Sequence, residues 1–208
     1  MQTNKSILLF AQRLYALAQT GLNYSTSEYD AERYEEIKEI SHSIVSLLSG
    51  LEKDVVADSY LPLKEYITPK VDIRAVVFNE KDEILLVQEK ADGLWSLPGG
   101  WSDVGFTPKE IAVKEVKEET GLDVLASRLL AVMDMREHDH PFIPFYVYKF
   151  FILCELEGGE FREVFDILDK GFFALDNLPP LSLERVLPEQ IHKMLELRNH
   201  PQMGVYMD

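Results

Sequence analysis

The sequence has little cysteine and little positive charge. Cys154 is the single thiol among 208 residues, so no disulfide can form within the chain, and the surrounding apolar run YKFFILCEL predicts a buried, unreactive side chain. Lys and Arg number 21 against 36 Asp and Glu, a formal net charge of -15. Such a charge repels a nucleic-acid backbone, which argues against DNA binding, and an anionic ligand would need cations. We expect a protein of the reducing cytoplasm.

Long hydrophobic runs are also missing. The N-terminal stretch MQTNKSILLFAQRLYALAQ is interrupted by polar or charged residues every few positions, so it predicts neither a signal peptide nor a membrane span, and no membrane partner is expected. With 46% hydrophobic and 27% charged residues, the composition is that of a folded globular chain of one large domain, with or without a small appendage.

Residues 1–67 are predicted to form a small helical domain. Between Ile7 and Ala18, apolar residues recur at spacings of three and four, as a one-sided helix requires. A second helix follows the capping residues 25–28 and stops at Gly50, and a third covers residues 51–59. The first 66 residues hold six basic and ten acidic side chains, which again argues against a DNA-reading module. The apolar stripe is expected to pack on the main domain or on a partner chain.

Residues 68–208 read as a second domain that contains strands. The segment VDIRAVVFNEKDEILLVQEK alternates around a polar turn at residues 79–82 and predicts a hairpin. Strand-like segments follow at residues 126–137 and 144–158, and a C-terminal helix is predicted near residues 189–198. Strands with helices between them, without long regular alternation, favour an α+β or α/β sandwich.

One helix carries an unusual amount of like charge. Thr107 is predicted to cap it, with Pro108 at its first position and Glu110 completing a capping box, and Gly121 supplies the stop. Helical spacing predicts that the three glutamates share one side of the helix with two apolar residues: Ile111, Glu115, Glu118, Glu119 and Leu122. The other side is predicted to face a core: Ala112, Val113, Val116 and Thr120.

Such spacing of like charges destabilises an isolated helix by a few tenths of a kcal/mol per pair, roughly, so a compensating partner is expected. Lys114 and Lys117 on the same helix could compensate, in which case the acids are a solvated charged face. The loop before the helix, LPGGWSDVG, contains glycines that permit backbone to approach a ligand. Together, the loop and the acids predict a site for hard divalent cations such as Mg²⁺.

The positions that carry this pattern match the spacing of the Nudix box: Gly100, Glu115, Val116, Glu118, Glu119, Gly121 and Leu122. The chain thus resembles the Nudix hydrolases, which act on nucleoside diphosphates linked to another moiety. This resemblance implies a Nudix α/β/α sandwich with a mixed sheet, in which the helix binds metal. Lys114 stands where the box usually has arginine, and Phe106 stands where its first glutamate is expected, so one acid of the usual set is absent.

The helical segment before this domain is similar to a bacterial Nudix subgroup with an extra N-terminal domain, grouped around CDP-choline and ADP-ribose pyrophosphatases. The resemblance implies hydrolysis of such a diphosphate to a nucleoside monophosphate and a phosphorylated moiety. It also implies a homodimer that involves the N-terminal helices. Two alternatives remain: a regulator that senses a nucleotide without cleaving it, and a hydrolase of RNA 5′ ends, although no basic, aromatic RNA path is evident.

By the same resemblance, Glu115, Glu118 and Glu119 are the catalytic and metal-binding residues, holding Mg²⁺ or Mn²⁺ against the diphosphate, with the carbonyl of Gly99 in the metal shell. The general base is left open. It is either a glutamate of the box or one of four acids in the later segment GGEFREVFDILDKG: Glu160, Glu163, Asp166 and Asp169.

Four residues are candidates for binding substrate: Arg74, Trp95, Arg136 and His140. Arg74 either contacts a phosphate or pairs with a structural acid. Trp95, like Phe142 and Tyr146, either stacks on a base or packs in the core. Arg136 and His140 either contact phosphate or ribose or lie in an exposed loop; with His138 alone nearby, they do not predict a zinc site.

Overall fold

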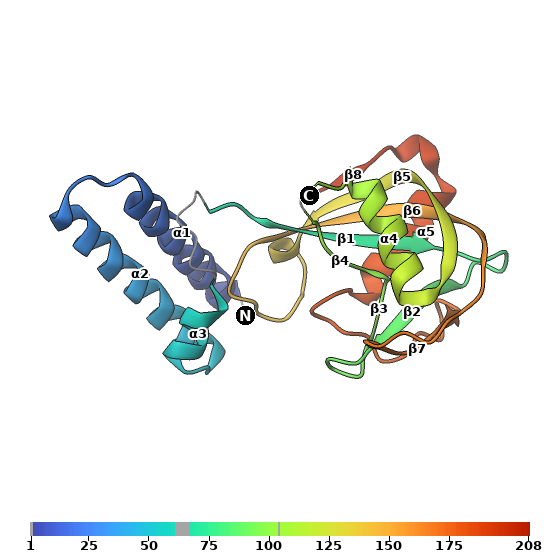
Figure 1. Ribbon diagram of the computed structural model, residues 1–208, viewed down its shortest axis with the longest axis horizontal. Coiled ribbons are helices and arrows are strands. Elements are labelled where there is room, and N and C mark those ends of the chain that lie inside the picture. The colour runs from blue at the N-terminus through green and yellow to red at the C-terminus, as the bar shows by residue number, and fades with distance from the viewer. Residues whose placement is uncertain (1, 61–66, 104) are drawn as a thin grey trace. The chain divides into compact units, whose positions relative to one another are not determined.

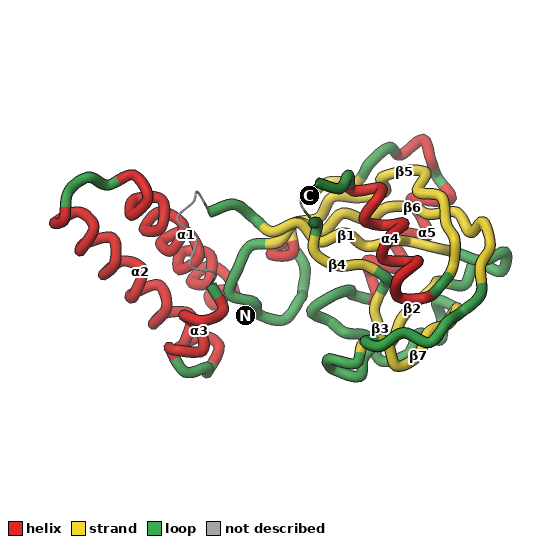
Figure 2. The backbone as a smooth tube through the Cα atoms, in the orientation of Figure 1, coloured by secondary structure: helices red, strands yellow, loops and turns green. Residues whose placement is uncertain are grey.

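The computed structural model describes residues 2–60, 67–103 and 105–208, and the chain divides into two compact units. The first unit comprises Met1–Pro69 together with Phe142–Tyr146, and the second comprises Lys70–Pro141 and Val147–Asp208. Figure 1 draws both units, and Figure 2 shows that helices make up the first and that strands dominate the second. No helix among the described residues is long and apolar enough to cross a membrane.

The first unit contains the three predicted helices: α1 (Gln2–Tyr24), α2 (Glu28–Ser49) and α3 (Lys53–Ser59). The hydroxyl of Ser27 caps α2 by accepting a hydrogen bond from the N–H of Asp30, and Gly50 ends the helix at φ 72°. A positive φ costs glycine nothing, which is why the helix stops at this residue.

The core of the first unit is small. Ala11, Val45 and Val56 are fully buried, with four partly buried neighbours around them: Leu8, Ile44, Tyr60 and Phe142. The segment 142–146 is fastened by the hydroxyl of Tyr60, which donates to the carbonyl of Pro144 at 2.6 Å. The ring of Tyr60 also stacks on Tyr15, with 3.9 Å between ring centroids. The small apolar core and the contacts of Tyr60 therefore hold this unit together.

The second unit has two sheets. The larger is mixed, in the order β4-β1-β6-β5-β8: β4 (Gly99–Trp101), β1 (Lys70–Val77), β6 (Val147–Gly159), β5 (Leu122–Asp134) and β8 (Tyr206–Met207). Strand β1 runs parallel to β6 and antiparallel to β4. The smaller sheet is antiparallel, in the order β3-β2-β7: β3 (Trp95–Ser96), β2 (Ile84–Glu89) and β7 (Ile167–Phe173).

The predicted hairpin of β1 and β2 is wrong, although its turn is present. The N–H of Asn79 bonds to the carbonyl of Glu83, but β1 and β2 then enter different sheets and share only the isolated bridge between Phe78 and Ile84. Strand β1 is buried on both faces from Asp72 onward. A strand buried on both sides pairs according to the topology of the sheet rather than the nearest turn.

Two helices cover opposite faces of the larger sheet, α4 (Pro108–Thr120) and α5 (Pro188–Asn199). Alternate residues of β1 divide between two cores. Ile73, Ala75 and Val77 pack with α4, whereas Val76 packs with α5. The layers are therefore helix, sheet and helix, which confirms the predicted α/β/α sandwich with a mixed sheet (Figure 1).

Candidate active site

The predicted start and stop of α4 are confirmed. Thr107 and Glu110 form a reciprocal capping box, Pro108 is the first helical residue, and Gly121 ends the helix at φ 86°. The helix is thus fixed at both ends.

Ala112, Val116 and Thr120 face the core as predicted, but the three glutamates on the other predicted side differ in depth. Glu119 is buried, with 8% of its surface exposed, and lies on the core side with Ile111 and Val116. The side chain of Glu115 is 15% exposed and that of Glu118 is 60% exposed. The acids therefore form a gradient from the interior to solvent, because spacings of three and four residues differ by about 100° in helical phase.

Glycines of β4 make room for two of these carboxylates. The N–H of Gly99 donates to Oε2 of Glu119 at 3.1 Å. Gly99 has φ 146°, and a Cβ there would lie 2.0 Å from the carbonyl oxygen of Ile73, so this position admits only glycine. A Cβ on Gly100 would lie 3.6 Å from Oε2 of Glu115. The contact of Gly99 with the acids is through its N–H; the role of its carbonyl stays a prediction.

Burial dominates the electrostatics of these acids. It raises the pKa of Glu119 to about 8; Arg74 opposes this rise, while the like charges of Glu89 and Glu115 add to it. Burial also raises the pKa of Glu115, and the ammonium of Lys114 opposes that rise. Each carboxylate is therefore held where its charged form is costly, and an additional cation would stabilise that form.

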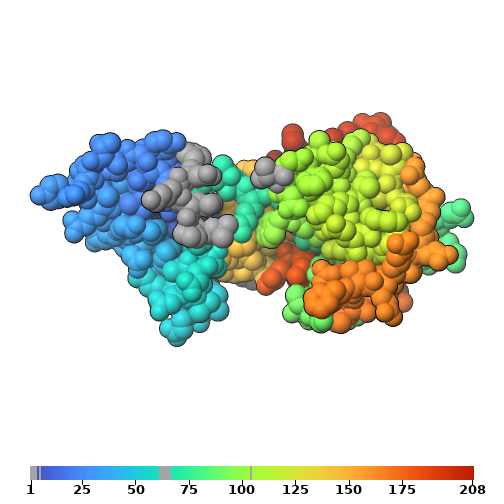
Figure 3. Space-filling view, in the orientation of Figure 1, coloured from blue at the N-terminus to red at the C-terminus, as the bar shows by residue number. Residues whose placement is uncertain are grey.

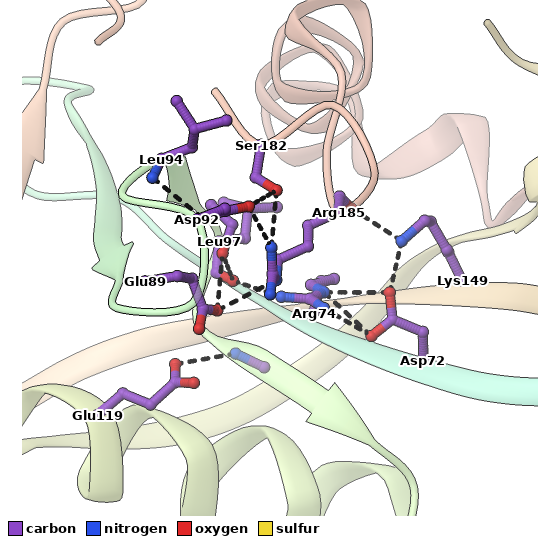
Figure 4. A network of polar contacts seen from close by, with 12 residues as sticks. Asp72, Arg74, Glu89, Asp92, Leu94, Leu97, Glu119, Lys149, Ser182 and Arg185 are labelled. Atoms are coloured by element: carbon purple, nitrogen blue, oxygen red, sulfur yellow. Dashed lines mark hydrogen bonds and ion pairs between the residues drawn. The ribbon is translucent and has the colours of Figure 1, made fainter. Parts of the chain in front are cut away.

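A buried network of charged side chains lies beside Glu119 (Figure 4). Asp72 accepts hydrogen bonds from Nε of Arg74 at 3.0 and 3.1 Å and from Nζ of Lys149 at 2.5 Å. Burial alone would raise the pKa of Asp72, but the two cations together lower it. Arg74 also donates to the carbonyl of Leu97 at 3.0 Å. The structure thus shows Arg74 pairing with a structural acid, the second of its two predicted roles.

A second group of ion pairs adjoins this network and was missed from the sequence. Nε of Arg185 lies 3.4 Å from Oε1 of Glu89, and its Nη1 lies 2.6 Å from Oδ2 of Asp92. The hydroxyl of Ser182 also donates to Asp92, at 2.8 Å. The carbonyl of Arg185 accepts from Lys149 at 2.8 Å, which connects the two groups (Figure 4). The sequence signal for buried ion pairs in this region is the presence of charged residues, Asp72 and Lys149, inside apolar strands.

The other substrate candidates lie in different surroundings. Trp95 packs on the core, with its ring edge-on to Phe173 at 4.7 Å between centroids. Arg136 forms ion pairs with Asp134 and Glu137. His140 contacts the carbonyl of Leu183 through Nδ1 and the side chain of Gln190 through Nε2; burial lowers its pKa to about 4. These contacts favour packing and structural pairing, and binding of substrate by the three residues stays a prediction.

The loop that carries the candidate general bases runs beside α4. The N–H of Arg162 bonds to the carbonyl of Thr120, and the carbonyl of Asp166 accepts from the N–H of Lys90 at the end of β2. On the face drawn in Figure 3, residues near 160 (orange) border those of α4 (yellow-green). The four acids of this segment are all exposed: Glu160, Glu163, Asp166 and Asp169.

The donors fit a hard divalent cation in chemistry and burial, although within residues 2–60, 67–103 and 105–208 no three His, Cys, Asp or Glu side chains already lie close enough to enclose one. Glu115 and Glu119 offer oxygen ligands, the kind that Mg²⁺ prefers. Lys114 lies 3.6 Å from both Glu115 and Glu118 and 3.0 Å from Asp103. The ammonium of Lys114 is thus shared among three carboxylates. Among the described residues, Glu119 forms no ion pair.

The second unit thus combines an α/β/α sandwich with carboxylates of graded burial between a capped helix and a diglycine strand. The chain belongs to the Nudix family: residues 68–194 match the NUDIX domain, and the chain is a Nudix hydrolase. Residues 5–60 match a second family model, a UDP-X-like, N-terminal oligomerisation domain.

Relatives and solved structures agree with this assignment. YjhB of Bacillus subtilis, provisionally named an ADP-ribose pyrophosphatase, is 43% identical over 198 residues, 95% of each chain. The crystal structure of an ADP-ribose pyrophosphatase from Streptococcus suis is 48% identical, covering 67% of this chain and 98% of that one, with a TM-score of 0.59. The structure of a UDP-X diphosphatase is 34% identical and covers 99% of both chains, with a TM-score of 0.64.

Proposed function

We propose that this chain uses Mg²⁺ or Mn²⁺ to hydrolyse the diphosphate bond of a nucleoside diphosphate derivative, yielding a nucleoside monophosphate and a phosphorylated moiety. ADP-ribose is the first candidate substrate, because YjhB and the Streptococcus suis protein are named for it. UDP-linked compounds follow from the UDP-X diphosphatase, and CDP-choline stays a prediction. The observation that carries the proposal is the buried carboxylate of Glu119 beside the N–H of Gly99.

The distribution of charge supports a requirement for metal. Arg74 and Lys149 are engaged by Asp72, and Arg185 is engaged by Glu89 and Asp92. Glu115 and Glu119 add further negative charge where a diphosphate must approach. A bound Mg²⁺ or Mn²⁺ supplies charge neutralisation and an activated water for such a reaction.

We assign the residues as follows. Glu119 and Glu115 hold the cation, and the exposed Glu118 completes the set at the solvent side. The glycines of β4 hold the backbone close to these carboxylates. The proton of the attacking water is accepted by a glutamate of the box or by an acid of the loop at residues 160–169, whose exposed acids are free to turn toward substrate.

The N-terminal helices are proposed to form a homodimer. The match to an oligomerisation domain supports this. So do Phe10, Leu17 and Tyr24, which recur seven residues apart on α1 and are all more than half exposed. An apolar row with that spacing lies along one side of a helix and suits burial against a second copy. The cytoplasmic location inferred from the single cysteine stays a prediction.

A panel of nucleotides tests the proposed reaction. The full-length protein is incubated with ADP-ribose, UDP-linked sugars and CDP-choline in Mg²⁺, in Mn²⁺ and in EDTA, and the products are separated by chromatography. We expect nucleoside monophosphate only with a divalent cation. Tight nucleotide binding without cleavage in either metal would contradict the proposal and favour a regulator, and cleavage restricted to 5′-diphosphorylated RNA would favour the RNA alternative.

A further inference from the structure

Glu89 is an acid outside the Nudix box that reaches the same site. It is the last residue of β2, where the pairing with β7 shifts register between Gln88 and Glu89. One extra residue of β7, Leu168, lies between the partners of these two residues. The side chain of Glu89 is only 16% exposed. A mostly buried carboxylate therefore lies at the end of β2, a strand that the sequence assigns to a hairpin.

The contacts of Glu89 leave one of its oxygens toward Glu119. Nε of Arg185 and the hydroxyl of Ser96 both lie 3.4 Å from Oε1 of Glu89. In Figure 4, Oε2 points to the side of the network where Glu119 and the N–H of Gly99 lie. The charge of Glu89 also acts on Glu119 more strongly than that of Glu115 does. The two carboxylates are thus neighbours, although they come from β2 and α4.

Two carboxylates placed side by side in a half-buried site are destabilising unless a cation offsets their charge. Glu89 and Glu119 repel each other; Arg185 pairs with Glu89, and the charge of Arg74 offsets part of the burial cost of Glu119. A cation shared by the two acids would turn this repulsion into attraction. The position at which the family pattern places a further acid is occupied here by Phe106, which is half exposed and cannot bind a cation through oxygen. One carboxylate is missing from the box, and one unassigned carboxylate lies beside it.

We propose that Glu89 is a ligand of the divalent cation, acting with Glu115 and Glu119, and that Arg185 positions it. This inference rests on the proposed function, since it concerns the same cation. The guanidinium of Arg185 is itself anchored by Asp92, so it holds Oε1 of Glu89 in place and leaves Oε2 for the metal. Hydrogen bonds from outside the shell commonly orient metal ligands in this way.

Direct measurement of metal binding tests the proposal without relying on activity. Mn²⁺ is titrated into the full-length wild type, Glu89→Gln, Glu119→Gln and Glu155→Gln, and unbound Mn²⁺ is measured by electron paramagnetic resonance. Glu155 is exposed on β6, so it is the matched control for the same chemical change. We expect Glu89→Gln to weaken Mn²⁺ binding about tenfold or more, with no change in Glu155→Gln. Arg185→Met should weaken it less, and Arg185→Lys should recover part of that loss.

Thermal melting gives a second readout. In EDTA, Glu89→Gln should melt at or above the wild-type temperature, because removing the negative charge relieves repulsion and the amide can still accept from Ser96. In Mn²⁺, wild type should gain more stability than the variant. Equal Mn²⁺ affinities of wild type and Glu89→Gln would overturn the proposal. If Glu119→Gln alone lost binding, the proposed function would stand and Glu89 would not be a ligand; if wild type bound no Mn²⁺, both would fail.

Discussion

The two units of this chain treat charged and apolar side chains in opposite ways. The second unit buries charges: Asp72, Lys149 and Glu119 all lie inside it, and ion pairs compensate the first two. The first unit buries almost no charge and exposes apolar side chains on α1, among them Phe10 and Leu17. Exposed apolar rows favour association with another protein surface, whereas buried acids favour binding of cations.

The two units also differ in the size of their apolar cores. The second unit accepts the cost of a buried, uncompensated carboxylate, and its large cores on both faces of the sheet offset that cost. Among the described residues of the first unit, the fully buried apolar side chains are Ala11, Ala18, Val45 and Val56, a small core beside those of the second unit. Variants that affect one unit and spare the other can therefore test each half of the account.

Glu119→Gln is expected to have the largest effect. Loss of the buried ligand should lower kcat/KM by at least about a thousandfold, equivalent to about 4 kcal/mol. In EDTA the same variant should be more stable at pH 7, by on the order of 1–3 kcal/mol. The sign follows from the pKa of Glu119, which folding raises from 4.5 to about 8, so ionisation in this window disfavours the folded state. Steady-state kinetics and denaturant unfolding measure the two effects; a variant that loses stability in EDTA would contradict this account.

Asp72→Asn should damage the second unit with little effect on the first. The substitution removes the counter-charge of two buried cations, Arg74 and Lys149, which costs about 3–5 kcal/mol. Both tryptophans, Trp95 and Trp101, belong to the second unit, so their fluorescence during guanidinium unfolding reports on this unit alone. Glu155→Gln serves again as the control. A loss below about 1 kcal/mol would mean that the network contributes little to stability.

Association should depend on the apolar row of α1. The double variant Phe10→Glu and Leu17→Glu is expected to shift the protein from dimer to monomer, because each glutamate places an unpaired charge in the interface. Leu47→Glu is the matched control, since Leu47 is exposed on α2 and lies outside that row. Light scattering coupled to gel filtration measures the mass. A monomeric wild type, or dissociation by Leu47→Glu alone, would show that this row is not the interface.

His42 should give the first unit a modest pH dependence. It is buried against Tyr60, and neither ring nitrogen has a hydrogen-bond partner among the described residues. Burial lowers its pKa below 6.5, so the unfolded chain binds a proton that the folded unit excludes. The free energy of unfolding of this unit should therefore be independent of His42 above about pH 6.5 and decrease as the pH drops below that value.

Melting curves at pH 7.5 and pH 5.5 test this, with far-UV circular dichroism for the helices and tryptophan fluorescence for the second unit. His42→Phe keeps an aromatic ring between its neighbours and should reduce the acid sensitivity of the helical signal. An unchanged acid sensitivity in that variant would assign the effect to other groups.

Much of the fold follows from local signals in the sequence. The caps at Thr107 and Gly121 fixed the limits of α4, and Gly50 ended α2 as predicted. The pairing of β1 did not follow, because a strand buried on both faces lacks the alternation that identifies a partner. The register shift opposite Glu89 lies in β7, about 80 residues later in the chain, so no local pattern predicts it.

The acids of the candidate site could be identified from the sequence, but not how deeply each is buried. Fixed spacing identified Glu115, Glu118 and Glu119, and the sequence left open whether they form a solvated face or a cation site. Tertiary packing buries Glu119, because α4 lies against the glycines of β4, which have no side chains to keep it away. Arg185 lies more than 60 residues after the box and is brought to the site by the fold alone.

Calorimetric titration of Mg²⁺ into the full-length protein, with nucleoside monophosphate present, tests the central claim most directly. The account predicts saturable binding that Glu119→Gln weakens strongly and Glu155→Gln leaves unchanged. Binding of equal strength in wild type and Glu119→Gln, or no binding in wild type, would contradict the claim that the acids of α4 hold a divalent cation for diphosphate hydrolysis.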